Sequence, residues 1–353
     1  MTVLKLGSLF DGIGVFPLAA VHCGIEPVWA SEIEARPISI TRRHFPDMLH
    51  LGDITKISGA EIPPVDVITF GSPCQDLSQI GTRNGFAGKK SSLFYQAMRI
   101  IEEMRYATNG RYPAFTVWEN VAGAFSSNDR LDFAAMLSAF TGAEVSVPPR
   151  GWAHAGMVRG GRADTAWRLL DAQYWGEPAL VQRRKRVFVV ADFAGQRAGE
   201  VLFKPRTVLP FSSIGGPGGL SATQRGGVPA AQTGRQVPVV RPFSLRRMRT
   251  MAQVGDQKGF CASFGRGGEP FPTLLASVTA PFSFWYEGEE QDGFLRVLTP
   301  LECERLMGLP ENWTKYGCKN EEISDHARYR ALGNSIALPC AEYVMAGIAE
   351  VMN

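Results

Sequence analysis

The sequence predicts an α/β protein with a mostly parallel sheet covered by helices on both faces, followed by a small, loop-rich domain that contains β-structure. Short apolar, β-rich runs alternate with helical stretches through the first half of the chain, which is typical of sheets buried on both sides. The alternation stops near residue 195, where glycine and proline become frequent. The length of 353 residues suits one large domain and a smaller one.

The elements of the first half follow one another as strand–helix units. The predicted strands are Val3–Leu9, Pro27–Ser31, Val65–Gly71, Ala114–Val121 and Arg186–Phe193. The predicted helices between them include Val15–Cys23, which ends before Gly24, and Ser92–Arg105, whose apolar residues can share one side.

From residue 195 to about 290 the chain has no long helical period, and we predict a β-containing, loop-rich domain there. Helical periodicity returns at Thr299–Met307, where Thr299 and Glu302 have the spacing of a capping box. A last helix is expected over Ala337–Met352. We therefore expect three parts: a large domain at 1–194, a separate domain at 195–295, and a returning segment at 296–353 that completes the first domain.

Composition excludes several classes of protein. Apolar residues make up 45% of the chain and charged residues 20%, which is a globular balance. No run approaches the ~18 apolar residues of a spanning helix, and the N-terminal residues resemble neither a secretory signal nor a transit peptide. Six cysteines without a C-x-x-C pair and five histidines argue against a disulfide scaffold and against a metal site. We expect a reducing, cytoplasmic setting.

Positive charge is concentrated in one part of the chain. Residues 196–250 hold nine lysines and arginines and one acid, Glu200, so this segment carries +8 while the rest of the chain sums to −5. A solvated basic face would explain many charge runs, but a run inside one glycine- and proline-rich stretch favours a polyanionic partner.

Three acidic or glycine-rich sites follow the first predicted strands. The turn from Phe10 to Gly14 leaves a strand and opens a helix, where glycines let a ligand approach the backbone. Glu32 ends the second strand and can accept both hydroxyls of a ribose, and Asp53, near the end of the next expected strand, can take an adenine amino group. Together they predict an adenosine pocket, although a structural turn alone would explain the glycines.

Cys74 follows the strand Val65–Gly71 inside the run Gly71–Gln75. Free cysteines are most often buried hydrophobes, but a polar turn before a loop at 79–91 suits an exposed thiolate nucleophile. Glu119 closes a neighbouring strand, and the basic run Gln182–Arg186 precedes another. The nucleophile, the acid and the cations are therefore expected at one edge of the sheet.

In this order, these motifs resemble those of the cytosine-5 DNA methyltransferase family. The matching motifs are Phe-x-Gly-x-Gly, Pro-Cys-Gln, Glu-Asn-Val, Gln-Arg-Arg-x-Arg, the element Arg296–Pro300 and Gly333-Asn334-Ser335. The resemblance implies a Rossmann-like, S-adenosylmethionine-dependent methyltransferase fold with a mixed sheet, and places the target recognition domain at 195–295.

Residue roles then follow from the resemblance. The implied catalytic residues are Cys74, Glu119, Arg184 and Arg186. The implied residues for S-adenosylmethionine and its product S-adenosylhomocysteine are Phe10, Gly12, Ile13, Gly14, Glu32, Asp53, Ile54, Pro73, Leu93 and Asn334. The implied contacts to duplex DNA are Ser78, Gln79, Arg246, Arg247, Arg249 and Thr273. A monomer is expected in a bacterial or phage-infected cell, with a restriction endonuclease for the same site as a candidate partner.

Two stretches depart from the family pattern. Residues 177–181 look like a small insertion before Gln182, and 141–166 is long and loop-rich, either an extra DNA-facing loop or a surface insertion. Three other functions stay open. A transfer-RNA cytosine methyltransferase could share the core, a DNA-binding protein without activity would lack a use for the nucleophile, and a nicotinamide oxidoreductase would explain the glycine turn alone.

Overall fold

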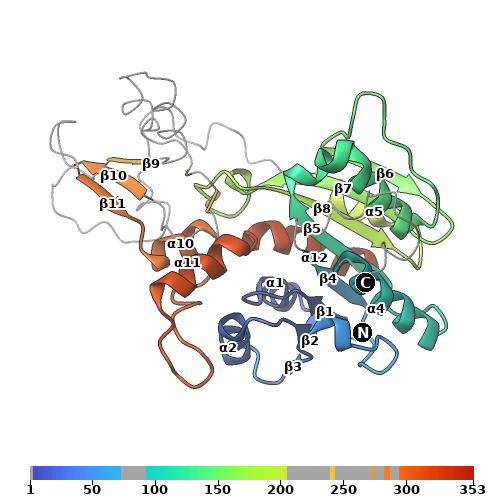
Figure 1. Cartoon of the computed structure of the whole chain (residues 1–353), viewed down its shortest axis with the longest axis horizontal. Helices are drawn as coiled ribbons and strands as arrows, with labels where there is room; N and C mark the ends of the chain where they lie inside the picture. Colours follow the sequence, from blue (N-terminus) through green and yellow to red (C-terminus); the bar gives the residue numbers. More distant parts are fainter. Residues whose placement is uncertain are drawn as a thin grey trace.

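The computed structural model describes residues 3–72, 93–204, 239–242, 271, 273–274, 282–286 and 294–353. Within these residues, a large sheet is covered by helices on both faces, and a small sheet lies apart from it (Figure 1). Helices α10 (Pro300–Leu306) and α11 (Asp325–Asn334) lie between the two sheets.

The large sheet has eight strands in the order β3-β2-β1-β4-β5-β8-β7-β6. Its strands are β1 (Lys5–Leu9), β2 (Glu26–Ser31), β3 (Leu49–His50), β4 (Val67–Phe70), β5 (Phe115–Val121), β6 (Ala155–Arg159), β7 (Asp164–Asp171) and β8 (Lys185–Asp192). Strands β1 to β5 run parallel, whereas β8, β7 and β6 pair antiparallel. The sheet is therefore mixed, as the methyltransferase resemblance implied.

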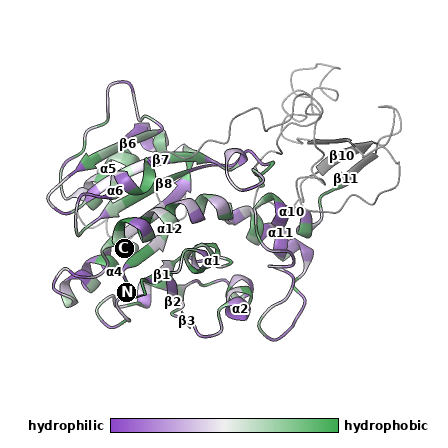
Figure 2. Cartoon of the chain, turned by 180° about the vertical axis from the view of Figure 1, so that it is seen from behind, coloured by the Kyte–Doolittle hydropathy of each residue, from purple (hydrophilic) through white to green (hydrophobic). Residues whose placement is uncertain are grey.

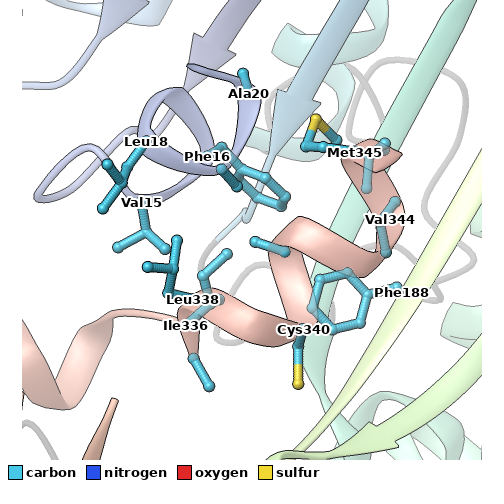
Figure 3. Close-up of a cluster of buried hydrophobic side chains, with 14 of the residues drawn as sticks. Val15, Phe16, Leu18, Ala20, Phe188, Ile336, Leu338, Cys340, Val344 and Met345 are labelled. Atoms are coloured by element: carbon cyan, nitrogen blue, oxygen red, sulfur yellow. The ribbon is translucent and has the colours of Figure 1, made fainter. Parts of the chain in front are cut away.

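Helices cover the two faces unequally and build two hydrophobic clusters. One face packs against α1 (Val15–His22), α2 (Ala35–His44), α6 (Ala198–Leu202), α10 and α12 (Leu338–Met352). The other face packs against α4 (Leu93–Ala107) and α5 (Leu131–Thr141). Figure 3 shows Val15 and Phe16 of α1 facing Leu338 and Val344 of α12. The end of the chain thus completes the core that its beginning starts.

The stretch 141–166 is not simply a loop-rich insertion. Residues 155–159 and 164–171 form the hairpin of β6 and β7, in which Trp167 pairs with Gly156. A Cβ on Gly156 would lie 2.3 Å from the Trp167 ring, so glycine is what lets the ring lie across β6. No residue of β6 is buried, so its sequence lacks the buried apolar run by which the other strands were predicted.

The predicted domain boundary at residue 195 is too early. Helix α6 buries Ala198, Val201 and Leu202 in the first hydrophobic cluster, beneath α12. Two residues of the basic segment also form ion pairs with the large domain: Arg197 pairs with Asp192 at 2.9 Å, and Lys204 pairs with Glu350. The large domain therefore continues at least through α6.

The small sheet confirms β-structure in the region after 195. It consists of β9 (Val239–Pro242), β10 (Phe282–Tyr286) and β11 (Phe294–Val297), antiparallel and in the order β11-β10-β9. Strand β11 leads directly into α10, and Figure 2 shows hydrophilic colours on α11 beside it. Among the described helices none alone is long and apolar enough to cross a membrane, and only the bent pair α11 and α12 together meet the length and composition for it.

A buried charged cluster fixes the returning segment before it reaches α12. The predicted capping box is present, with Thr299 and Glu302 bonded to each other's backbone at the start of α10. Further along α10, the fully buried carboxylate of Glu304 accepts a hydrogen bond from Arg328 Nη2 at 3.0 Å. It also accepts from the backbone amides of Asn312 and Thr314. A buried carboxylate needs this full set of donors to offset its lost hydration.

We expect Arg328→Met to lower the free energy of unfolding by about 3–5 kcal/mol, because it leaves the Glu304 carboxylate without its cation in the interior. Arg330→Met on the same helix removes an exposed pair with Glu34 and should cost less than about 1 kcal/mol. Urea denaturation of both variants measures the difference. Equal losses would mean that Glu304 does not depend on Arg328.

Candidate active site at the carboxyl edge of the sheet

The carboxyl ends of β1, β2, β4 and β5 lie at one edge of the sheet, where antiparallel β8 begins. Parallel sheets bind their ligands at this edge because the loops there converge. Four sequence-predicted features meet here: the glycine turn after β1, Glu32 after β2, Glu119 in β5, and Arg186 in β8. The edge is therefore the candidate active site.

The glycine turn has the backbone conformation that its sequence requires. Gly12 and Gly14 have φ angles of 59° and 78°, in the left-handed region, and Gly14 caps α1. A Cβ on Gly14 would press against Thr41 and Phe45 at 3.2 Å, whereas a Cβ on Gly12 would meet nothing within 4 Å. Open space therefore lies over Gly12, where a ligand could approach the backbone.

Glu32 and Asp53 are brought to this turn by short backbone contacts. Glu32 accepts the Gly12 amide at 2.9 Å on one oxygen and the amides of the next two residues on the other. The Ser31 hydroxyl donates to the Gly52 carbonyl at 2.6 Å, which holds the Asp53 turn beside Glu32. Glu32 therefore contacts the glycine turn directly, and the turn that carries Asp53 is held by the residue before Glu32.

Asp53 lies three residues after β3, which ends at His50, and it caps the short 3-10 helix Ile54–Lys56. One Asp53 oxygen accepts the Thr55 amide at 2.9 Å and the Thr55 hydroxyl at 2.8 Å. These bonds lower the pKa of Asp53. The residue stays ionised in neutral solution, so it remains an acceptor.

The other predicted cofactor residues divide by exposure. Phe10 and Leu93 are partly buried and pack against the second hydrophobic cluster, and Asn334 is exposed at the end of α11. The Ile13 and Ile54 side chains are buried in the two clusters, so only their backbones can face a ligand. Pro73 lies outside the described residues.

Sequence reasoning missed the contacts that the returning segment makes with this pocket. The Trp313 indole donates to the Ile13 carbonyl at 2.8 Å and stacks on His44 at 3.6 Å between ring centroids. Arg330 of α11 pairs with Glu34 at 2.6 Å, two residues after Glu32. Ile33, which lies between Glu32 and Glu34 in the sequence, is 72% exposed and offers an apolar surface beside these two glutamates. A tryptophan far along the chain gives no local signal for such a role.

Asp11 is a second residue that the sequence did not single out. Its carboxylate is wholly buried beneath the turn, and burial raises its pKa to about 7, with a smaller lowering by the neighbouring Ser8 hydroxyl and a further rise from Glu32. A carboxyl group in this setting binds a proton more tightly in the folded protein than in the unfolded chain.

We therefore expect Asp11→Asn to change how stability depends on pH. The wild-type protein loses stability as the pH rises from the ordinary aspartate value of 3.8 toward about 7, because the unfolded chain releases the proton first. The full effect is at most about 4 kcal/mol. The asparagine variant should lack this decline. Urea denaturation over the same pH range compares the two, with exposed Asp47→Asn as the control, and a constant difference between wild type and Asp11→Asn would contradict the expectation.

Glu119 lies at the end of β5 in contact with Arg186. Arg186 Nε is 2.9 Å from Glu119 Oε1, and both side chains are largely buried. Burial raises the pKa of Glu119, and the neighbouring Arg186 and Arg184 oppose that rise. A Cβ on Gly71 would lie 3.2 Å from Glu119 Oε2, so the acid lies against the backbone that leads toward residue 74.

Ser72 is held from two sides where the chain leaves β4. The Trp118 indole donates to its hydroxyl at 3.1 Å, and the Asn120 amide donates to its carbonyl at 3.0 Å. Both donors flank Glu119, so the acid and the start of the following loop are fixed by the same strand. Cys74, Ser78, Gln79, Arg246, Arg247 and Arg249 lie outside the described residues.

Arg184 does not face the open edge with Arg186. It is 1% exposed, and its guanidinium donates to the carbonyls of Leu274 at 2.8 Å, of Gly333 at 2.9 Å and of Ser335. Its contacts therefore do not support the expected role of holding a base. Thr273 donates to the Arg183 carbonyl at 2.6 Å, so it contacts the basic motif rather than standing free.

Comparison with known proteins gives one family for nearly the whole chain. The family model of C-5 cytosine-specific DNA methylases matches residues 4–204 and 243–350. Among curated proteins, the chain is 23% identical to the Type II methyltransferase M.HhaI of Haemophilus parahaemolyticus, over 100% of this chain and 96% of that protein. It is 26% identical to M1.ScrFI of Lactococcus lactis, over 99% of this chain and 78% of that protein.

A relative from Escherichia phage P1, described as a DNA N-6-adenine-methyltransferase, is 24% identical over 98% of this chain, which spans only 61% of that protein. Among solved structures, a DNA modification methyltransferase from an Escherichia coli prophage has a TM-score of 0.59 at 17% identity, with 99% of both chains covered. The Dnmt2 methyltransferase of Schizosaccharomyces pombe has a TM-score of 0.56 at 15% identity, with both chains fully covered. At these identities the structural matches support the fold alone.

Proposed function

Because this chain belongs to the C-5 cytosine-specific DNA methylase family, we propose that it transfers a methyl group from S-adenosylmethionine to C5 of cytosine in duplex DNA, with Cys74 as the nucleophile. The observation that carries the proposal is the buried Glu119–Arg186 pair at 2.9 Å, lying against Gly71. The chain reaches Cys74 within three residues of that contact.

C5 of cytosine is a weak nucleophile, so the ring must first be activated. The Cys74 thiolate adds to C6, and Glu119 hydrogen-bonds N3 and the exocyclic amino group as electron density moves into the ring. The raised pKa of Glu119, caused by burial, favours the protonated carboxyl that can donate to N3. After methylation a base removes the C5 proton, and Cys74 leaves by elimination.

Arg186 is the arginine that we assign to the reacting base. Arg186 is the second residue of β8, and its side chain reaches Glu119. Its positive charge also favours a neighbouring thiolate. Both Nη atoms of Arg184 donate to backbone carbonyls, so we do not assign it to the base. The two arginines of the motif therefore have different roles.

The residues around the glycine turn fit S-adenosylmethionine, which supplies an electrophilic methyl group when bound. Glu32 accepts ribose hydroxyls, and Asp53 accepts from the adenine amino group with the oxygen that Thr55 leaves free. Phe10 and Ile33 offer apolar surface for the adenine ring. The open space over Gly12 gives the cofactor access to the backbone.

Target recognition is assigned to the region after α6, where the sequence is basic and the small sheet β9–β11 lies. Cytosine in stacked DNA hides C5 and C6, so the base must be flipped out, and Ser78 and Gln79 in the loop after Cys74 are expected to fill its place. A cytoplasmic setting, a monomeric state and a cognate restriction endonuclease remain predictions.

A transfer RNA substrate is the alternative within the same chemistry. The basic segment favours a polyanion without separating DNA from RNA. Methylation assays on both nucleic acids with the purified protein decide between them. We do not assign this chain the adenine methylation named for the phage P1 relative, because methylation of an adenine amino group does not need a covalent adduct with Cys74.

We expect Cys74→Ser to abolish turnover while leaving S-adenosylhomocysteine binding largely intact, because a serine hydroxyl is hardly ionised at neutral pH. Cys318→Ser, at an exposed free cysteine, is the matched control and should keep full activity. Methylation of duplex DNA measures both. With 5-fluorocytosine at the target, wild-type protein should form a covalent adduct that the Cys74 variant does not, and near-normal turnover of that variant would remove Cys74 as nucleophile.

Glu32→Ala and Asp53→Ala should each weaken S-adenosylhomocysteine binding by about 1–3 kcal/mol, because each removes a charge-assisted hydrogen bond. Asp47→Ala, at an exposed carboxylate to which the proposal gives no role, should leave the affinity unchanged. Calorimetric titration gives all three affinities. The pocket is misplaced if neither Glu32→Ala nor Asp53→Ala changes the affinity.

A further inference from the structure

The Arg184 guanidinium joins three segments that are far apart in sequence. Arg184 lies immediately before β8, one Nη donates to the Leu274 carbonyl, and the other donates to the carbonyls of Gly333 and Ser335. The residue is 1% exposed. The mechanism proposed above gives this buried cation no task.

The Leu274 side of this contact belongs to the region assigned to recognition. Phe271 forms a parallel β-bridge with Gln182. In this bridge the Phe271 amide donates to the Val181 carbonyl at 2.6 Å, and the Arg183 amide donates to the Phe271 carbonyl at 2.7 Å. Phe271 and Leu274 are each 4% exposed and pack in the first hydrophobic cluster. Phe271 and Leu274 therefore attach the recognition region to the large domain.

The Gly333 and Ser335 side belongs to the cofactor pocket. These residues flank Asn334 at the end of α11, the helix whose Arg330 pairs with Glu34 beside the adenosine pocket. A ligand that fixes this turn also fixes the two carbonyls that Arg184 uses. We call residues 333–335 the cofactor turn.

The Arg184 guanidinium bonds only to carbonyls among the described residues, with no carboxylate hydrogen-bonded to it. Burial, and then repulsion by Arg186, lower its pKa to about 9, which still leaves it charged in neutral solution. A buried charge without a direct counter-ion depends on each of its hydrogen bonds. Displacing either carbonyl segment therefore weakens the hold on the other.

We propose that Arg184 is a positioning residue that couples Phe271 and Leu274 to the cofactor turn, so that cofactor binding and sequence-specific DNA binding strengthen each other. The inference rests on the proposed function, since it takes the two sites from it. Linkage requires the coupling to be reciprocal: each ligand must raise the affinity for the other by the same factor.

The test is a binding cycle with S-adenosylhomocysteine and a short duplex that carries the site mapped by sequencing of the methylated product. For wild-type protein we expect each ligand to tighten the other at least about fivefold. Arg184→Lys keeps the charge, but one ammonium cannot reproduce the guanidinium fork across both segments. We expect its coupling factor to fall to near one, whatever its affinity for each ligand alone.

Arg105→Lys is the matched control. Arg105 also donates from both Nη atoms to carbonyls, those of Pro113 and Phe193, but at the opposite edge of the sheet. This variant should keep the wild-type coupling factor even if it is less stable. An Arg184→Lys protein with wild-type coupling would overturn the proposal, as would equal loss of coupling in both variants.

Hydrogen exchange on the wild-type protein gives a test that no folding defect can affect. S-adenosylhomocysteine alone should slow exchange of the Arg183 and Phe271 amides, because the cofactor turn then holds Arg184 and Arg184 holds the bridge. Unchanged exchange at both amides with saturating S-adenosylhomocysteine would overturn the coupling. Failure of the protein to bind S-adenosylhomocysteine at all would instead count against the proposed function.

Discussion

The antiparallel pairing of β5 with β8 is the constraint on which the site depends. Its register pairs Val121 with Arg186 and Glu119 with Phe188, which lets the Arg186 side chain reach Glu119 at 2.9 Å. A slip of one residue would turn every side chain of β8 to the other face. The buried apolar residues of β8, such as Val187 and Phe188, prevent such a slip because they pack into different clusters on opposite faces.

The end of the chain completes what this pairing begins. Helix α12 covers the same face as α1, and the segment before it reaches the cofactor pocket through Trp313 and Arg330. The Glu304–Arg328 cluster holds that segment in shape, since Glu304 takes donors from both sides of the turn at 312–314. The proposed cofactor pocket therefore takes residues from both ends of the chain, with the region that we assign to target recognition between them.

Three ionisable groups that are buried at this edge have shifted pKa values. Asp11 and Glu119 have raised pKa values and Arg184 a lowered one, in each case chiefly because of burial. Such groups cost stability, and shifted pKa values of this kind are common where a site needs fixed charges without water. Arg184 and Arg186 are two residues apart, yet one faces carbonyls in the interior and the other faces Glu119.

The sequence by itself determined the parallel half of the sheet, the glycine turn, Glu32, Glu119 and the capping box of α10, because each leaves a local pattern: apolar strands, positive-φ glycines, and fixed spacings. The family motifs also identified the chemistry. Only the tertiary structure decided that 155–171 forms a hairpin, that α6 belongs to the large domain, and that Arg184 is buried while Arg186 reaches Glu119. These depend on contacts such as Arg184 with Leu274 and Trp313 with Ile13, between residues far apart in the chain. No local pattern encodes such contacts, because their energy comes from packing that exists only once the chain has folded.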